Sequence, residues 1–192
     1  VTKDTRKIGL GVMGFADLLL LLGIPYNSEK GIDLAEKIMK YINTVGHNAS
    51  CKLAVKRGPF PLFYSSTLAD LEPRRNGTVT TIAPTGTLSI IAGCSSGVEP
   101  VFAYAYIRNV MDGTEMVEVN PILLKKLKEV GLYSESLMKK IAKEGTIANF
   151  EEIPEEIRNV FVCAHDISPI SHIKMQAAFQ RHTDNAVSKT VN

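Results

Sequence analysis

Five consecutive β-branched residues at positions 78–82 constrain the fold of this chain more than any other feature. Side chains that branch at Cβ favour extended backbone, so the run predicts a strand. Pro84 and Gly86 interrupt it with a turn, and residues 87–92 are predicted to form a short helix after that turn. A strand that leads through a turn into a helix is typical of an α/β chain.

Two helical patterns precede this unit. Residues 12–23 are apolar apart from Asp17 and predict a buried helix that ends at Gly23. Ser28 is then expected to cap a longer helix that extends to about Lys56. Apolar residues recur along this helix at steps of three and four, which predicts one face turned to a core: Leu34, Ile38, Ile42, Val45, Ala49 and Leu53.

The rest of the chain alternates between extended and helical patterns. Strands are expected at 101–110 and 186–191, and helices at 120–130, 134–143 and 168–185. Residues 58–77 predict an irregular connection, and residues 144–160 predict a polar surface excursion. The alternation indicates the α/β class, although these strands are too few to close a sheet by themselves.

Size, charge and apolar runs narrow the function classes. The chain has 192 residues, which suits one domain, and a net charge of +2, which argues against an extended nucleic-acid surface. The longest apolar stretch, 18–22, is far too short for a membrane span, and no signal-peptide pattern opens the chain. The chain starts at Val1 without a methionine and stops at Asn192 in the middle of a pattern, which predicts a piece of a longer polypeptide or a processed one.

The three cysteines are Cys51, Cys94 and Cys163. Their number is odd, their spacings are long, and they form no CxxC or Cys/His cluster, so the sequence predicts neither a disulfide framework nor a zinc site. This usage fits a reducing compartment, and a cytoplasmic protein is expected. Each cysteine is interpreted as a small buried group rather than a nucleophile.

Residues 9–14 match the G-x-G-x-x-G fingerprint of dinucleotide-binding folds. That fold needs a buried strand before the glycines and an acidic residue at a strand end about 20 positions later. Here a charged segment, 3–7, precedes Gly9, and the later acids Asp33 and Glu36 fall in a predicted helix. The alternative interpretation is that Gly9, Gly11 and Gly14 let backbone segments pack closely.

The segment after the predicted strand is the main candidate for binding. Free N–H groups at a helix start attract an anion, and Thr or Ser hydroxyls can add donors. Gly86 permits close approach or a positive φ, and no Lys follows as in a P-loop. The predicted phosphate-binding residues are Pro84, Thr85, Gly86, Thr87, Leu88 and Ser89. A capped strand–turn–helix corner without a ligand explains the same pattern.

Other polar residues give weaker indications. His47 and Cys51 lie four apart on one predicted helix, yet no third metal ligand is near in sequence. His165 with Asp166 is a candidate acid/base pair, although sequence neighbours seldom face each other. Glu99, beside Pro100, is a possible site residue with an ordinary loop carboxylate as the alternative. For His172 and His182, within a predicted helix, surface positions are expected.

Several motifs resemble one known family, in order along nearly the whole chain. Residues 6–17 resemble a segment of the large catalytic subunit of ribonucleotide reductases. Residues 81–87 resemble the substrate-phosphate loop of that family, and 95–100 resemble the segment that follows it. The ending, 175–192, is most similar to the adenosylcobalamin-dependent class II branch.

The resemblance implies a ten-stranded α/β barrel of two five-stranded parallel halves, with residues 1–192 forming part of the second half. It implies ribonucleotide reduction for deoxyribonucleotide synthesis and DNA replication. A thiyl radical abstracts the ribose 3′-hydrogen, the 2′-hydroxyl leaves as water, and a cysteine pair supplies electrons. In class II the radical arises by cobalt–carbon homolysis of adenosylcobalamin.

The resemblance also implies partners and missing parts. It implies a ribonucleotide substrate, the remaining reductase segments, a thioredoxin-type reductant and a homo-oligomeric complete enzyme, without nucleic acid or membrane. The family's radical cysteine, in an Asn-Pro-Cys-Gly-Glu segment, is expected before Val1, so no catalytic residue is assigned here. The competing hypotheses are a Rossmann-type oxidoreductase built on residues 9–14 and a non-enzymatic helical interaction module.

Overall fold

The computed structural model describes residues 1–109 and 115–191. Its helices are α1 Thr2–Thr5, α2 Phe15–Leu21, α3 Glu29–Arg57, α4 Gly86–Ala92, α5 Pro121–Glu129, α6 Glu135–Glu144, α7 Glu155–Val160 and α8 Pro169–Gln180. Its strands are β1 Ala105–Asn109 and β2 Glu115–Val119, and short 3-10 turns cover Phe63–Ser65 and Ala164–Asp166. None of the described helices has the length and apolar character that a membrane crossing requires.

Side-chain caps fix the starts of the main helices where the sequence predicted them. The Ser28 hydroxyl accepts a hydrogen bond from the Gly31 amide at 3.1 Å. Asn120, Ser134 and Ser168 cap α5, α6 and α8 in the same way. Each cap satisfies an amide that the first helical turn leaves without an internal partner. The predicted helix at 168–185 is too long, because α8 ends at Gln180.

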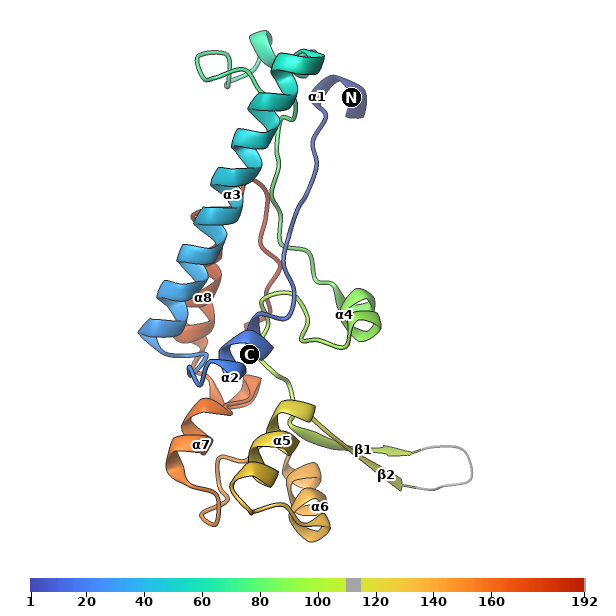
Figure 1. Ribbon diagram of the computed structural model, residues 1–192, viewed down its shortest axis with the longest axis vertical. Helices are drawn as coiled ribbons and strands as arrows, with labels where there is room; N and C mark the ends of the chain where they lie inside the picture. Colours follow the sequence, from blue (N-terminus) through green and yellow to red (C-terminus); the bar gives the residue numbers. More distant parts are fainter. Residues whose placement is uncertain (110–114, 192) are drawn as a thin grey trace.

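The long helix α3 packs against α8 along only part of its length (Figure 1). Its most buried apolar residues are Ile32, Ala35 and Met39, and part of the predicted stripe, Leu34, Ile38 and Ile42, packs at the margin of the same core. The rest of that stripe, Val45, Ala49 and Leu53, is exposed, which corrects the prediction. Beyond α8 the inward face of α3 is polar and makes side-chain hydrogen bonds to neighbouring loops: Asn43, His47 and Ser50.

Three extended segments run in parallel beside α3, to its right in Figure 1. We name residues 8–11, 78–82 and 185–188 the parallel ribbon. Single bridges join Leu10 to Thr80 and Ile82 to Val187, and the Ile82 amide donates to the Ala186 carbonyl at 3.2 Å. The strands predicted at 78–82 and 186–191 are therefore extended, but their pairing is too short for regular strands.

The described strands β1 and β2 form an antiparallel hairpin, with Ala105 opposite Val119 and Asn109 opposite Glu115. β1 lies within the predicted strand 101–110, whose last residue falls outside the described part of the chain. β2 was not predicted. α5, α6 and α7 gather beside this hairpin (Figure 1).

Two apolar clusters hold the molecule together. One joins α2, α3 and α8 to the parallel ribbon, and the other joins the hairpin to α5, α6 and α7. The prediction of a surface excursion at 144–160 is wrong, because four residues at steps of three and four are buried in the second cluster: Ile147, Phe150, Ile153 and Ile157. The chain has α/β content, and its described residues do not form a closed barrel.

Candidate phosphate-binding site

The candidate loop, residues 84–89, lies at the end of the central segment of the parallel ribbon. The three segments run in the same direction, so their carboxyl ends lie at one edge of the ribbon. That edge carries the start of α2, the candidate loop with α4, and Lys189. Ligands of parallel α/β sheets characteristically bind at such an edge.

Thr85 adopts a left-handed backbone conformation, with φ 56° and ψ 23°, immediately before α4. Gly86, for which the sequence allowed either close approach or a positive φ, is not in the left-handed region; the positive φ lies one residue earlier, at Thr85. A β-branched residue rarely adopts this conformation, and it does so only where its surroundings hold it there. The loop shape is therefore maintained by contacts with other residues.

The first amides of α4 are open to a ligand. The amides of Gly86, Thr87 and Leu88 have no hydrogen-bond acceptor among the described residues. Pro84 and these three residues are exposed, and a Cβ added at Gly86 would meet no atom within 4 Å. The amides therefore lack protein acceptors on an exposed turn, which anion binding at this turn requires.

The three predicted hydroxyl donors lie in different environments. The Thr87 side chain is exposed. The Thr85 hydroxyl accepts from the Gly97 amide at 2.7 Å and lies 3.4 Å from the Ser96 hydroxyl, to which it can donate because Ser96 itself donates to the Pro84 carbonyl. Ser89 is 5 % exposed and donates to the Gly86 carbonyl at 2.9 Å, so its hydroxyl supports the turn from inside.

Residues 94–99, which we name the bracing segment, hold the candidate loop from behind. The Ser96 hydroxyl donates to the Pro84 carbonyl at 2.5 Å, and the Gly97 amide reaches Thr85. At the other end, the Ser95 amide donates to the Asp17 carboxylate at 2.6 Å, and the Ser95 hydroxyl accepts from the Asp17 amide at 3.3 Å. The bracing segment thus ties the loop to the start of α2.

The same contacts explain the glycines at 9–14. A Cβ at Gly11 would lie 2.3 Å from the Thr81 carbonyl oxygen, and Gly14, with φ 77°, precedes α2. At the start of α2 the Asp17 amide already donates to the Ser95 hydroxyl. Ile8, which precedes the glycines, is 50 % exposed. Close packing of backbone segments accounts for this motif, and the arrangement lacks the buried strand of a dinucleotide-binding fold.

An ion pair between a fully buried lysine side chain and a partly exposed glutamate lies beside the bracing segment. The Lys189 ammonium, on a side chain with 0 % exposure, donates to the Glu99 carboxylate at 3.1 Å and to His172 Nδ1 at 2.8 Å. The predicted surface position of His172 is wrong, since this residue is fully buried. No sequence pattern pointed to a role for Lys189, because its partners Glu99 and His172 are 90 and 17 residues away.

The remaining candidates have partners within the protein. His47 donates from Nε2 to Asp184 at 2.8 Å and accepts at Nδ1 from Arg74 at 2.9 Å, so it does not join Cys51 in a metal site. Among the residues that the structure describes, no three His, Cys, Asp or Glu side chains are grouped to hold a metal ion. His182 pairs with Glu36 on α3.

His165 and Asp166 do not act together. His165 packs edge-on against the Phe102 ring, whereas the Asp166 carboxylate accepts from the Cys163 amide and the Thr146 hydroxyl. Cys163 is buried, and Cys51 and Cys94 are half-buried. Burial raises the pKa of the Cys51 and Cys163 thiols, which disfavours the nucleophilic thiolate.

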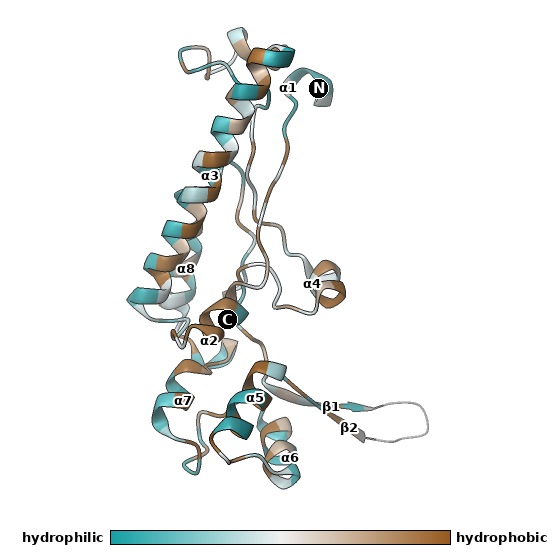
Figure 2. Cartoon of the chain, in the orientation of Figure 1, coloured by the Kyte–Doolittle hydropathy of each residue, from teal (hydrophilic) through white to brown (hydrophobic). Residues whose placement is uncertain are grey.

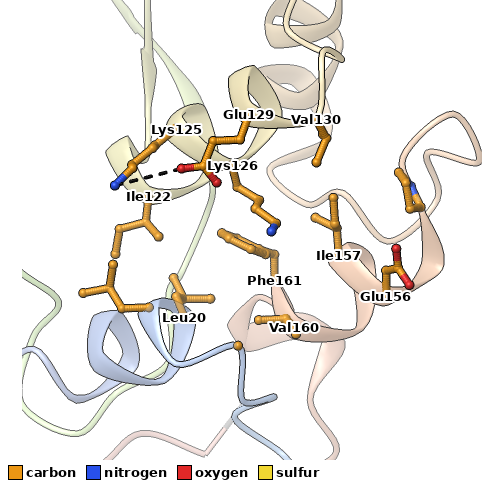
Figure 3. A pocket seen from close by; sticks show the side chains of 13 residues that line it. Leu20, Ile122, Lys125, Lys126, Glu129, Val130, Glu156, Ile157, Val160 and Phe161 are labelled. Carbon is orange, nitrogen blue, oxygen red and sulfur yellow. Dashed lines mark ion pairs between the residues drawn. The ribbon is translucent and has the colours of Figure 1, made fainter.

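A cavity of about 420 Å³ lies between α2, α5 and α7, away from the candidate loop (Figure 3). Its wall is mainly apolar and includes Leu20, Ile157 and Phe161, with Lys126 pointing into the space. The candidate loop is instead an open edge, and α4 presents apolar residues outward beside it (Figure 2): Leu88, Ile90 and Ile91.

Comparisons with known proteins agree on one family. A family model described as the barrel domain of ribonucleotide reductase matches residues 1–73 and 69–192. The chain is 53% identical over 193 residues to a vitamin B12-dependent ribonucleoside-diphosphate reductase of Thermoplasma acidophilum, with 100% of this chain and 25% of the relative covered. A protein of the same name from Mycobacterium tuberculosis is 48% identical over 190 residues, with 99% and 27% covered.

A solved structure shows the same arrangement. The class Id ribonucleotide reductase alpha subunit of Actinobacillus ureae superposes with a TM-score of 0.80 at 29% identity, covering 95% of this chain and 32% of that one. The chain thus spans about a quarter of the length of the curated relatives above.

Proposed function

This chain belongs to the ribonucleotide reductase barrel-domain family, and on that premise we propose that residues 84–89 bind the phosphates of a ribonucleotide substrate. The observation that carries the proposal is the group of open amides at Gly86, Thr87 and Leu88, which lie at an exposed edge without protein acceptors. Thr85 and Thr87 add hydroxyl donors. Neutral donors of this kind hold a substrate that keeps its phosphates throughout the reaction.

The proposed reaction is reduction of a ribonucleoside diphosphate to its deoxy form. A thiyl radical removes the 3′-hydrogen, the 2′-hydroxyl leaves as water, and a cysteine pair supplies two electrons. The radical and redox cysteines belong to other segments of the complete enzyme. Cys51 and Cys163 have a raised pKa, which supports a packing role instead.

The names of the two curated relatives support adenosylcobalamin as the cofactor of the complete enzyme. The described residues of this chain do not fit it alone. A corrin with its adenosyl group is larger than a drug-sized ligand, whose pockets have roughly 300–1,000 Å³. The cavity of about 420 Å³ is at the lower end, and three histidines already have protein partners: His47, His172 and His182. We therefore assign no step of the reaction to a contact between these residues and the cofactor.

We place residues 1–192 in the second half of a ten-stranded catalytic barrel, where the parallel ribbon supplies strand positions and other segments complete the sheet. The exposed apolar face of α4 supports this, since further protein would cover it. A cytoplasmic homo-oligomer reduced by a thioredoxin-type protein completes the proposal. This part of the proposal, the location, assembly and reductant, rests on family membership and on an ordinary net charge of +2.

The experiment is substrate binding by the complete enzyme carrying Gly86→Val. The structure has room for the new side chain, so the variant folds, while the isopropyl group blocks approach to the amides. Loss of one charge-assisted hydrogen bond, ~1.5–3 kcal/mol, weakens diphosphate binding about ten- to hundredfold. Lys174→Met, which removes an exposed ion pair between α8 and α3 away from the loop, is the control and keeps full affinity. Unchanged affinity in Gly86→Val would falsify the assignment.

A second experiment tests the reaction class. The chain is combined with the neighbouring segments of the reductase, and deoxynucleotide formation is measured with and without adenosylcobalamin. Product that depends on adenosylcobalamin supports class II. Product that instead requires an iron-containing partner subunit rules class II out and leaves the phosphate-loop assignment intact.

A further inference from the structure

We propose that Lys189 and Glu99 are positioning residues for the phosphate loop: their ion pair holds the bracing segment, and through it the left-handed Thr85, in the geometry that binds phosphates. The inference rests on the proposed function of residues 84–89. Neither residue is suggested to contact the substrate.

Lys189 is bound as a fully satisfied ammonium. Its three N–H donors have three acceptors: the Glu99 carboxylate at 3.1 Å, His172 Nδ1 at 2.8 Å and the Thr190 carbonyl at 2.9 Å. His172 can accept because its Nε2–H is committed to the Ala164 carbonyl at 3.1 Å, which fixes the neutral tautomer. A buried charge with every donor matched has one favourable geometry.

Glu99 transmits that geometry to the loop. One carboxylate oxygen accepts from Lys189 and the other from the Thr190 amide at 2.6 Å. The Glu99 amide donates to the Ser96 carbonyl at 2.9 Å. Ser96 in turn donates to the Pro84 carbonyl, so a continuous chain of hydrogen bonds runs from Lys189 to the candidate loop.

The bracing segment is anchored at both ends. Asp17 holds Ser95 at one end, and Lys189 with Thr190 holds Glu99 at the other. Between the anchors, the Gly97 amide donates to the Thr85 hydroxyl at 2.7 Å. Loss of the Lys189 anchor therefore frees the side of the segment that contacts Thr85, while Asp17 still ties the segment to α2.

A general stabilising ion pair would behave differently from a positioning device. It would lower overall stability and weaken every ligand of the site alike. A device that shapes the phosphate loop affects ligands that carry phosphates and spares those that lack them. The ratio of the affinities for cytidine 5′-diphosphate and cytidine separates the two roles.

The test uses the complete enzyme with Lys189→Met, Glu99→Gln and the double variant, and measures the binding of cytidine 5′-diphosphate and of cytidine. Each single change is expected to weaken diphosphate binding about tenfold, within the range for residues that act through a network, and to leave cytidine binding unchanged. In Glu99→Gln the side-chain NH2 group of the new glutamine, a donor, faces the Lys189 ammonium, which is also a donor. Both changes remove the same ion pair, so the double variant should bind the diphosphate about as weakly as each single variant, and a fully additive loss would contradict a shared role.

The control Lys174→Met removes an exposed ion pair with Glu29, at 2.9 Å, from the same helix that carries His172. It should leave both affinities unchanged. If Lys189→Met does not fold, Glu99→Gln carries the test. Equal weakening of both ligands, or no weakening of either, in variants of Lys189 and Glu99 overturns the inference. If Gly86→Val also keeps full diphosphate affinity, the proposed function itself fails.

Discussion

The Asp184 carboxylate accepts a hydrogen bond from the Val79 backbone amide at 2.6 Å, although 105 residues separate the two in sequence. The same carboxylate accepts from His47 at 2.8 Å and from Asn43 at 3.2 Å, both on α3. Asp184 thus joins the central segment of the parallel ribbon to the long helix. It fixes the register of the ribbon that leads into the phosphate loop.

Asp184→Asn should destabilise the enzyme in a pH-dependent way. Burial raises the pKa of Asp184, but hydrogen bonds from Val79, His47 and Asn43 outweigh burial, and the pKa is lowered from 3.8. The charged form therefore contributes stability that is present above pH 3.8 and is lost as pH falls through the lower folded pKa. The variant should lose ~1–3 kcal/mol at pH 7. Urea unfolding at pH 7 and pH 3 checks this, and a difference from the parent that stays constant with pH would contradict it.

His172 predicts a second, separate pH dependence. Burial lowers the pKa of its imidazole from 6.5, and the nearby Lys189 ammonium lowers it further, against the opposing effects of the Ala164 carbonyl and Glu99. The unfolded chain then binds the proton first, so stability is full above pH 6.5 and declines as pH falls toward the folded pKa. The urea concentration at the unfolding midpoint of the parent should decrease when the pH is lowered from 7 to 5. His172→Gln, which does not titrate, should show a flatter profile, and an equally steep one would refute this account.

Gly11 and Gly86 should respond in opposite ways to the same substitution. A Cβ at Gly11 would lie 2.3 Å from the Thr81 carbonyl oxygen, whereas at Gly86 it would meet nothing within 4 Å. Gly11→Ala should therefore cost ~1–3 kcal/mol or more by overpacking against backbone. Gly86→Ala should leave stability unchanged or raise it by ~0.4–1 kcal/mol. Chemical denaturation of the two variants measures the contrast, and equal stabilities would show that the ribbon does not pack as described.

Thr85→Gly should destabilise the protein less than Thr85→Val. Both changes remove the hydroxyl that accepts from Gly97, which costs ~1–3 kcal/mol when the amide is left unpaired. Valine keeps the unfavourable left-handed conformation, whereas glycine relieves it by about 1–2 kcal/mol. Thr85→Gly should therefore unfold at the higher denaturant concentration. The opposite order would mean that the φ of 56° is not what limits this position.

Sequence patterns predicted local structure well where a few neighbouring residues decide it. Ser28, Asn120, Ser134 and Ser168 each cap the helix expected after them, because a cap bonds to an amide two or three residues away. The prediction of a surface segment at 144–160 failed because many charged residues lie between the apolar ones. The buried apolar positions of this segment alternate with exposed charges. The patterns also gave no indication that Thr85, and not Gly86, has the positive φ of this turn.

By itself, the sequence determined the family and the capped helices and marked residues 84–89 as the candidate loop, since motifs and caps are written in adjacent residues. Only the tertiary structure decided that His172 is buried, that Lys189 pairs with Glu99, and that Asp184 holds Val79. These partners lie 90 and 105 residues apart in the two pairs. Their meeting depends on how the ribbon and the helices pack, and no spacing along the chain records that packing.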